Sequence, residues 1–126
     1  MFYEGAGCIR CQEQLNNFAA KVGGFAAFGI ELVAIGIDTP EDLKAAQASY
    51  QSEGGFAFPL LSDAKLEVFK SYGCITPDNK PLHGTFVIDG QGKVRWRNIS
   101  DKPFNDPALV LTEAKQLSIA VAARRQ

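Results

Sequence analysis

Several features that would point to other kinds of function are missing from this sequence. It contains no run of about 18 apolar residues, so no membrane span is expected. No signal peptide is visible either, and a cytoplasmic location is the expectation. The net charge of −1 gives no reason to expect nucleic acid or an anionic membrane as a partner. A glycine-rich phosphate loop, paired carboxylates and a Ser–His–Asp set are also lacking.

Cysteine is scarce too, with three residues in a chain of 126. Three is an odd number and too few for a disulfide scaffold. The count fits one redox pair, Cys8 and Cys11, and one spare thiol, Cys74. We expect Cys74 to pack in the core, because it follows Gly73 at the end of a predicted helix.

The Cys8–Cys11 pair is the most informative feature that the sequence does contain. The two sulfurs stand three residues apart at the start of a predicted helix, where they can form a disulfide or provide a reactive thiolate. Unpaired backbone N–H groups and the positive end of the helix dipole favour the anionic sulfur of the first cysteine. Arg10, between the two cysteines, could favour it further. Thiol–disulfide chemistry is therefore the leading functional hypothesis.

Hydrophobic periodicity and turn residues predict the secondary structure. Phe2–Tyr3 reads as the end of a buried strand. Four helices are expected, beginning at Cys8, at Thr39, at the capping residues Ser62–Asp63 and at Asp106. The first is expected to end at Gly23–Gly24 and the second at Gly54–Gly55. The residues expected on the inner faces are Val22 in the first helix, Tyr50 in the second, and Val110, Ala114, Leu117 and Val121 in the last. The expected strands cover residues 30–37, 58–61, 85–89 and 93–97, and Asp89 is expected to cap the turn between the last two.

The predicted order β-α-β-α-β-α-β-β-α describes an α/β protein. Early β-α-β crossovers imply parallel strands, and the late hairpin adds antiparallel ones. No repeat or linker divides the chain. We therefore expect one domain, residues 1–126, with a mixed β-sheet and helices on both faces.

Three segments, FYEGAGCIRC, FPLLSD and HGTFVIDGQGKVRWRNIS, together resemble the thioredoxin fold and, within it, the AhpC/TSA (peroxiredoxin-like, redoxin) family. They extend over nearly the whole chain in the order found in that family. The resemblance implies that an N-terminal strand of the family is absent or trimmed.

The resemblance implies a thiol-dependent oxidoreductase. Cys8 would be the attacking thiolate and Cys11 the resolving partner, while the turn that carries His83 and Thr85 would face them. The implied substrate is a peroxide or a protein disulfide, and the implied reductant is thioredoxin-like. A homodimer is possible. No bound cofactor is expected, because sulfur performs the two-electron chemistry itself.

The chain departs from the family at positions that bear on the substrate. Met1 and Gly5 stand where typical peroxiredoxins have Pro and Thr, and His83 stands in place of an Arg. Gly84 stands where thioredoxins have a cis-proline. Peroxidase and disulfide reductase activities both remain open, and the TFVID segment together with the missing cis-proline favours the peroxidase.

Two other hypotheses use the same residues. His83 could be a solvated loop residue, or it could stabilise the Cys8 thiolate as a charge or hydrogen-bond partner. It could also complete a copper-binding or copper-delivery site with Cys8 and Cys11. Alternatively, the fold could serve as a regulatory or interaction domain with inert cysteines.

Overall fold

The computed structural model describes residues 1–5, 7–48 and 56–124, with side chains up to residue 117. The helices and strands in this part of the chain are α1 (Ile9–Ala19), α2 (Val22–Ala26), β1 (Ala34–Gly36), α3 (Pro40–Ala48), β2 (Leu60–Ser62), α4 (Glu67–Ser71), β3 (His83–Ile88), β4 (Val94–Ser100) and α5 (Pro107–Arg124). No helix within these ranges is long and apolar enough to cross a membrane.

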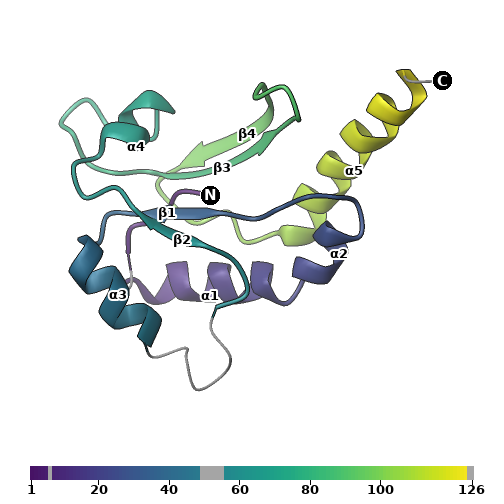
Figure 1. Ribbon diagram of the computed structural model, residues 1–126. Coiled ribbons are helices and arrows are strands. Elements are labelled where there is room, and N and C mark those ends of the chain that lie inside the picture. The colour runs from purple at the N-terminus through teal and green to yellow at the C-terminus, as the bar shows by residue number, and fades with distance from the viewer. Residues whose placement is uncertain (6, 49–55, 125–126) are drawn as a thin grey trace.

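A mixed sheet runs through the middle of the molecule in two halves (Figure 1). β1 and β2 pair in parallel, whereas β3 and β4 form an antiparallel hairpin. Phe2 lies between the halves, bridged in parallel to Ile35 and antiparallel to Gly84. The strand expected to end at Phe2–Tyr3 is thus reduced to a bridge at Phe2. The order across the sheet is β2, β1, Phe2, β3, β4.

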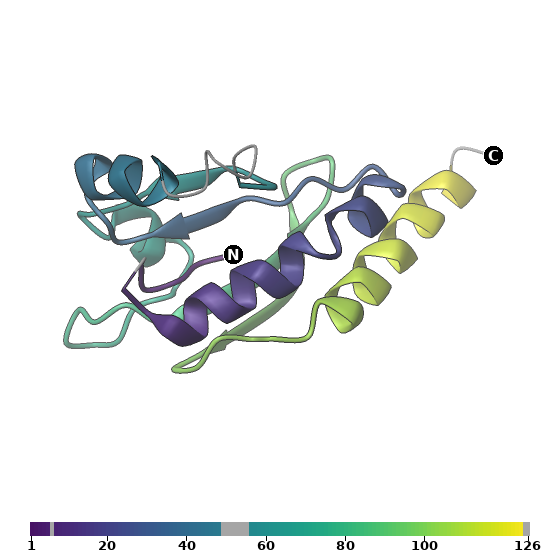
Figure 2. The same cartoon turned by 90° about the horizontal axis from the view of Figure 1, so that it is seen from below.

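Apolar side chains cover both faces of this sheet. One cluster joins α1, α2, α3 and α5 to the first face, and its buried members are Tyr3, Cys11, Leu15, Phe18, Phe25, Ala34, Leu43, Phe58, Leu60 and Val110. A smaller cluster around Phe2, Phe69 and Cys74 lies on the other face with α4. Seen from below in Figure 2, α1 crosses the first face of the sheet and α2 lies next to α5. The predicted mixed sheet with helices on both faces is confirmed.

The strands differ in length from the prediction. The apolar run 30–37 is paired as a strand only over Ala34–Gly36, where it lies opposite the three residues of β2. The predicted strand 58–61 is observed as β2, which begins two residues later and ends one residue later than predicted. Both hairpin strands are longer than predicted, because β3 already begins at His83 and β4 continues to Ser100.

The helix that begins after Cys8 ends earlier than predicted, and a second short helix follows. α1 stops at Ala19, and α2 contains the two glycines that were expected to end a single helix. Phe25 of α2 is buried and stacks on Phe18 of α1, with 6.2 Å between ring centroids. Burial of this ring in the core outweighs the weak helix propensity of the glycines.

The helix expected after Ser62–Asp63 also begins later. α4 starts at Glu67, because Leu66 adopts the left-handed conformation with φ 60°. Asp63 is nevertheless the residue that caps it, since its carboxylate accepts hydrogen bonds from the backbone N–H groups of Glu67, Val68 and Phe69. Ser62 is not a cap: it belongs to β2, and its hydroxyl donates to the Asp38 carbonyl.

The other predicted caps are confirmed. The Thr39 hydroxyl accepts from the Asp42 N–H and the Asp106 carboxylate from the Leu109 N–H, at the starts of α3 and α5. Asp89 accepts from two backbone N–H groups of the hairpin turn and from Arg95. The predictions for Tyr50, Gly54–Gly55 and the Val121 side chain lie outside the described residues.

Candidate functional site

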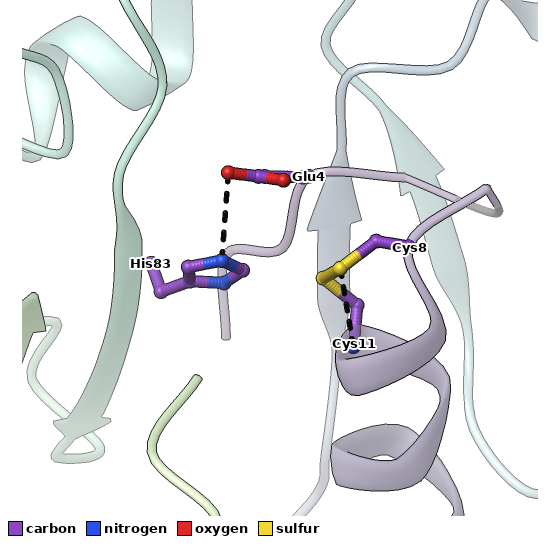
Figure 3. Close-up of a disulfide and its surroundings, with 4 residues drawn as sticks. All are labelled: Glu4, Cys8, Cys11 and His83. Carbon is purple, nitrogen blue, oxygen red and sulfur yellow. Dashed lines mark hydrogen bonds and ion pairs between the residues drawn. A yellow bond between two sulfur atoms is a disulfide. The ribbon is translucent and has the colours of Figure 1, made fainter. Parts of the chain in front are cut away.

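The start of α1 places both cysteines of the pair. Cys8 is the N-cap, with extended backbone angles, and Cys11 lies within the first turn. The backbone N–H of Cys11 donates to the Cys8 sulfur at 3.3 Å. The two residues form a disulfide with 5.2 Å between their Cα atoms (Figure 3). The helix therefore holds the first sulfur where backbone N–H groups favour negative charge.

The two cysteines differ in exposure. Cys11 is fully buried in the core cluster of α1, whereas Cys8 is half-buried at the surface. An incoming substrate can therefore reach Cys8, while Cys11 is accessible mainly through Cys8. This asymmetry matches the two roles that the sequence predicted for them. Those roles stay a prediction.

The loop before Cys8 requires a glycine at residue 5. Gly5 has φ +142°, and a Cβ built there would lie 2.9 Å from a carboxylate oxygen of Asp38. The Gly5 carbonyl also accepts a hydrogen bond from the Cys8 N–H. Glycine at this position therefore allows Glu4 and Cys8, on either side of it, to lie close together.

His83 lies in β3 and not in the turn that the resemblance implied, whereas Thr85 lies in a strand, as the predicted range 85–89 requires. Both are 4% exposed, and they pair with Ser100 and Asn98 of β4. His83 is therefore not a solvated loop residue. Its Nδ1 atom and the Thr85 hydroxyl have no hydrogen-bond partner within the described residues.

Glu4 is a site residue that the sequence analysis missed. Its carboxylate lies between His83 and the cysteine pair, with Oε1 3.7 Å from His83 Nε2 (Figure 3). Its ligand atom lies within 4.8 Å of both cysteine sulfurs. Glu4 carries no motif or spacing that marks it as functional. The one available signal is that it follows a buried aromatic pair directly.

His83 itself is outside the group of closely spaced ligand atoms. In the part of the chain that the structure describes, the group of at least three possible metal ligands is Glu4, Cys8 and Cys11. The copper site considered as an alternative, with Cys8, Cys11 and His83 as ligands, is therefore not assembled among the described residues. His83 contacts the carboxylate and not the pair of sulfurs.

Burial decides the charge of His83. Its pKa lies below the usual value because the buried imidazolium loses hydration, and the carboxylates of Glu4 and Asp101 act in the opposite direction. Burial therefore opposes the positive charge that His83 was considered above to provide.

Cys74 lies in the other core cluster, as predicted. It is 0% exposed, and burial raises its pKa to about 11. A Cβ built on Gly84 would collide with the Cys74 sulfur and lie 2.8 Å from Phe86 Cε2. Glycine is therefore required between His83 and Thr85. Cys74 is a structural thiol packed behind this strand.

The remaining polar candidates are not part of the site. The Arg10 side chain is exposed and makes no hydrogen bond or ion pair within the described ranges. Arg95 and Arg97 lie on the exposed side of β4, and Arg95 pairs with Asp89. Trp96 is partly buried and packs against Phe104, at 5.4 Å between ring centroids, beside the larger core cluster.

Comparison with known proteins agrees with this geometry. The family model of the AhpC/TSA family matches residues 1–97. Among curated proteins, the chain is 33% identical over 102 residues to a protein of Mycobacterium tuberculosis named provisionally as a peroxiredoxin. It is 30% identical over 98 residues to alkyl hydroperoxide reductase C of Buchnera aphidicola. The aligned regions cover 74% and 75% of this chain but only 61% and 50% of these two relatives.

Solved structures support the fold. The crystal structure of Enterococcus faecalis AhpC superposes with a TM-score of 0.79 at 17% identity, covering 99% of this chain and 77% of the other. The mitochondrial 2-cys peroxiredoxin from Plasmodium falciparum gives 0.77 at 24% identity, covering 99% and 76%. The predicted thioredoxin-like fold is confirmed.

Proposed function

We propose that this chain, which belongs to the AhpC/TSA family, is a thiol-dependent peroxidase in which Cys8 attacks the peroxide and Cys11 resolves the product. The observation that carries the proposal is the disulfide at the start of α1, with the half-exposed Cys8 as N-cap and the buried Cys11 behind it. Because the chain spans less than two-thirds of the curated relatives described above, their activity is an inference for this chain.

The position of Cys8 supplies the ionised sulfur that the chemistry needs. A thiol at a helix N-terminus can have a pKa of about 3.5–7.5, against about 8.5 for a free cysteine. In the reduced protein the Cys11 N–H, which contacts the Cys8 sulfur at 3.3 Å, would donate to the thiolate. Arg10 makes no contact with it, so the backbone would provide most of this stabilisation.

The two cysteine sulfurs supply the two electrons that reduce the peroxide. The Cys8 thiolate attacks one peroxide oxygen and the O–O bond breaks, which leaves a sulfenic acid on Cys8 and, after protonation, an alcohol or water. The Cys11 thiol then attacks the sulfenic sulfur, the S–S bond forms and water leaves. An external dithiol reduces the disulfide and is itself oxidised. A thioredoxin-like protein is the reductant that the family resemblance implies.

A disulfide reductase without peroxidase activity is the second candidate. The observation that favours it is Gly5, whose backbone conformation and contact with Asp38 leave no room for the threonine that peroxiredoxins have at this position. The site thus lacks a hydroxyl that the resemblance associates with peroxide binding. Both candidates use the same cysteines in the same order.

Single cysteine variants test the roles. Cys8→Ser should abolish both peroxide consumption and reduction of insulin disulfides. Cys11→Ser should accumulate a sulfenic acid on Cys8, detected as a dimedone adduct by mass spectrometry. Cys74→Ala is the matched control, because it removes the thiol outside the pair, and it should retain activity. Full activity of Cys8→Ser in whichever assay works would refute the assignment.

The two substrate classes separate in the same experiment. A peroxidase should turn over peroxide with thioredoxin, thioredoxin reductase and NADPH, whereas a disulfide reductase should reduce insulin disulfides and leave peroxide unchanged.

The homodimer, the single domain of residues 1–126 and the cytoplasmic location stay predictions. Size-exclusion chromatography with light scattering would determine the first of these.

A further inference from the structure

We propose that reduction of the Cys8–Cys11 disulfide creates a zinc site, in which the two thiolates and the Glu4 carboxylate bind one Zn²⁺ ion and keep the protein out of its redox cycle. The inference rests on the proposed function in one respect, namely that the cysteine pair can be reduced. It concerns the regulation of that same site.

The geometry of three ligand atoms supports this proposal. The Glu4 carboxylate and the two sulfurs lie within 4.8 Å of one another. Ligands at about 2.0–2.3 Å from one tetrahedral zinc ion are separated from each other by about 3.3–3.8 Å. Breaking the S–S bond moves the sulfurs apart towards such a spacing. The three groups therefore need only small shifts to bind one ion.

The chemistry of these ligands favours zinc over copper. Zn²⁺ binds cysteine sulfur together with carboxylate oxygen, whereas Cu(I) prefers purely soft ligands. The imidazole that a copper site would use is not in the group but contacts Glu4 Oε1 through His83 Nε2 at 3.7 Å. A histidine in this place can orient the carboxylate as an outer partner of the metal.

Burial gives the site one dry and one open side. Cys11 is fully buried, Cys8 is half-buried, and the Glu4 side chain is 48% exposed. An ion held by these three groups would keep its fourth position towards solvent, where a water molecule can bind. The N-terminus of α1 stabilises the charge of the thiolates, as it does for the free Cys8 thiolate.

Zinc binding and disulfide formation exclude each other. On loading, the Cys11 thiol releases its proton and binds Zn²⁺ together with the Cys8 thiolate. When peroxide oxidises the loaded site, the two thiolates give up two electrons and form the disulfide. Hydrogen peroxide accepts these electrons with two protons to yield two water molecules, and Zn²⁺ is released. Zinc would therefore protect the thiols and slow peroxide turnover until it is displaced or removed.

Titration of the reduced protein with zinc chloride under anaerobic conditions tests the site. Competition with a chelating dye should give one tightly bound ion per chain, and cobalt should give a thiolate charge-transfer band. Glu4→Gln and His83→Asn should each weaken zinc binding about tenfold or more. Glu13→Gln is the matched control, since it removes an exposed carboxylate from α1 outside the group, and it should bind as the wild type does.

The outcomes separate this proposal from the proposed function. Absence of stoichiometric zinc binding, or equal binding by Glu4→Gln and Glu13→Gln, overturns the zinc site, even if the metal-free protein is an active peroxidase. Conversely, tight binding that depends on Glu4 supports the site even if no turnover is detected, in which case the enzyme proposal fails. Release of one zinc ion per disulfide formed with peroxide would support both.

Discussion

Replacement of Gly84 by alanine should disrupt the strand that carries His83 and Thr85. A Cβ at this position would collide with the Cys74 sulfur and lie 2.8 Å from Phe86 Cε2 and 3.5 Å from Phe2 Cδ2. None of these neighbours can move away freely, because Cys74 and Phe2 are buried in the core cluster beside α4. Overpacking of this kind costs about 1–3 kcal/mol. We expect a value near the upper end for Gly84→Ala.

The Cys74 sulfur should account for much of this cost. Cys74→Ala alone removes one buried heavy atom and should destabilise the protein by about 1 kcal/mol. In the double variant the new methyl group occupies part of the space that the sulfur vacates. The double variant should therefore lose about 1–2 kcal/mol less than the sum of the single variants. The contact with Phe86 remains, so the rescue is incomplete.

Urea unfolding of the disulfide form, followed by circular dichroism and Trp96 fluorescence, measures these free energies. Gly90→Ala is the matched control in the turn that follows β3, because a Cβ there meets nothing within 4 Å; its stability should stay within about 0.5 kcal/mol of the wild type. Additive effects of Gly84→Ala and Cys74→Ala would contradict the contact that this reasoning depends on.

Three further predictions concern stability and titration. Asp63→Ala should destabilise the protein by about 2–3 kcal/mol in urea unfolding, because three backbone N–H groups at the start of α4 lose their acceptor, and Asp63→Asn should cost less. Burial raises the pKa of Cys74 from 9.0 to about 11, so the unfolded chain loses this proton at lower pH than the folded protein does. The free energy of unfolding should therefore fall between about pH 9 and pH 11 in the wild type, and less in Cys74→Ala. Equal pH profiles of the two proteins would refute this. Burial lowers the pKa of His83 and the Glu4 carboxylate raises it, so Glu4→Gln should lower this pKa further in an NMR titration. As the pH falls below 6.5, acid should destabilise the wild type more than His83→Asn, because the folded protein resists protonation of the buried imidazole.

Features whose cause lies within a few residues could be predicted from the sequence. The caps at Thr39 and Asp106 act on backbone groups three residues away, and the hairpin around Asp89 closes on itself. The cysteine pair belongs to this class, because an N-cap position and a spacing of one helical turn place both sulfurs. The α/β order followed from such local signals, and the family resemblance supplied the topology.

Features that depend on distant partners could not be predicted in this way. α2 exists because Phe25 stacks on Phe18 across a break in the helix, while the propensity of Gly23–Gly24 favours an end. The start of α4 is delayed by the left-handed conformation of Leu66, although the capping carboxylate was identified correctly. In both places tertiary packing overrides the local preference.

The contact between Glu4 and His83 also depends on distant partners, which is why no local sequence pattern indicates it. Phe2 and Gly84 exchange backbone hydrogen bonds of 2.6 and 3.3 Å, and this antiparallel register sets residues just after Phe2 beside those just before Gly84. Phe2 is held there by Phe69 and Phe86, at 4.9 and 5.6 Å between ring centroids. The sequence predicted the end of a strand at Phe2–Tyr3, but a bridge of one residue carries no pattern that tells which strand it pairs with or in which register. The carboxylate beside the cysteines is thus positioned by an aromatic contact on the opposite face of the sheet, and a change at Phe2 should alter the site without touching either sulfur.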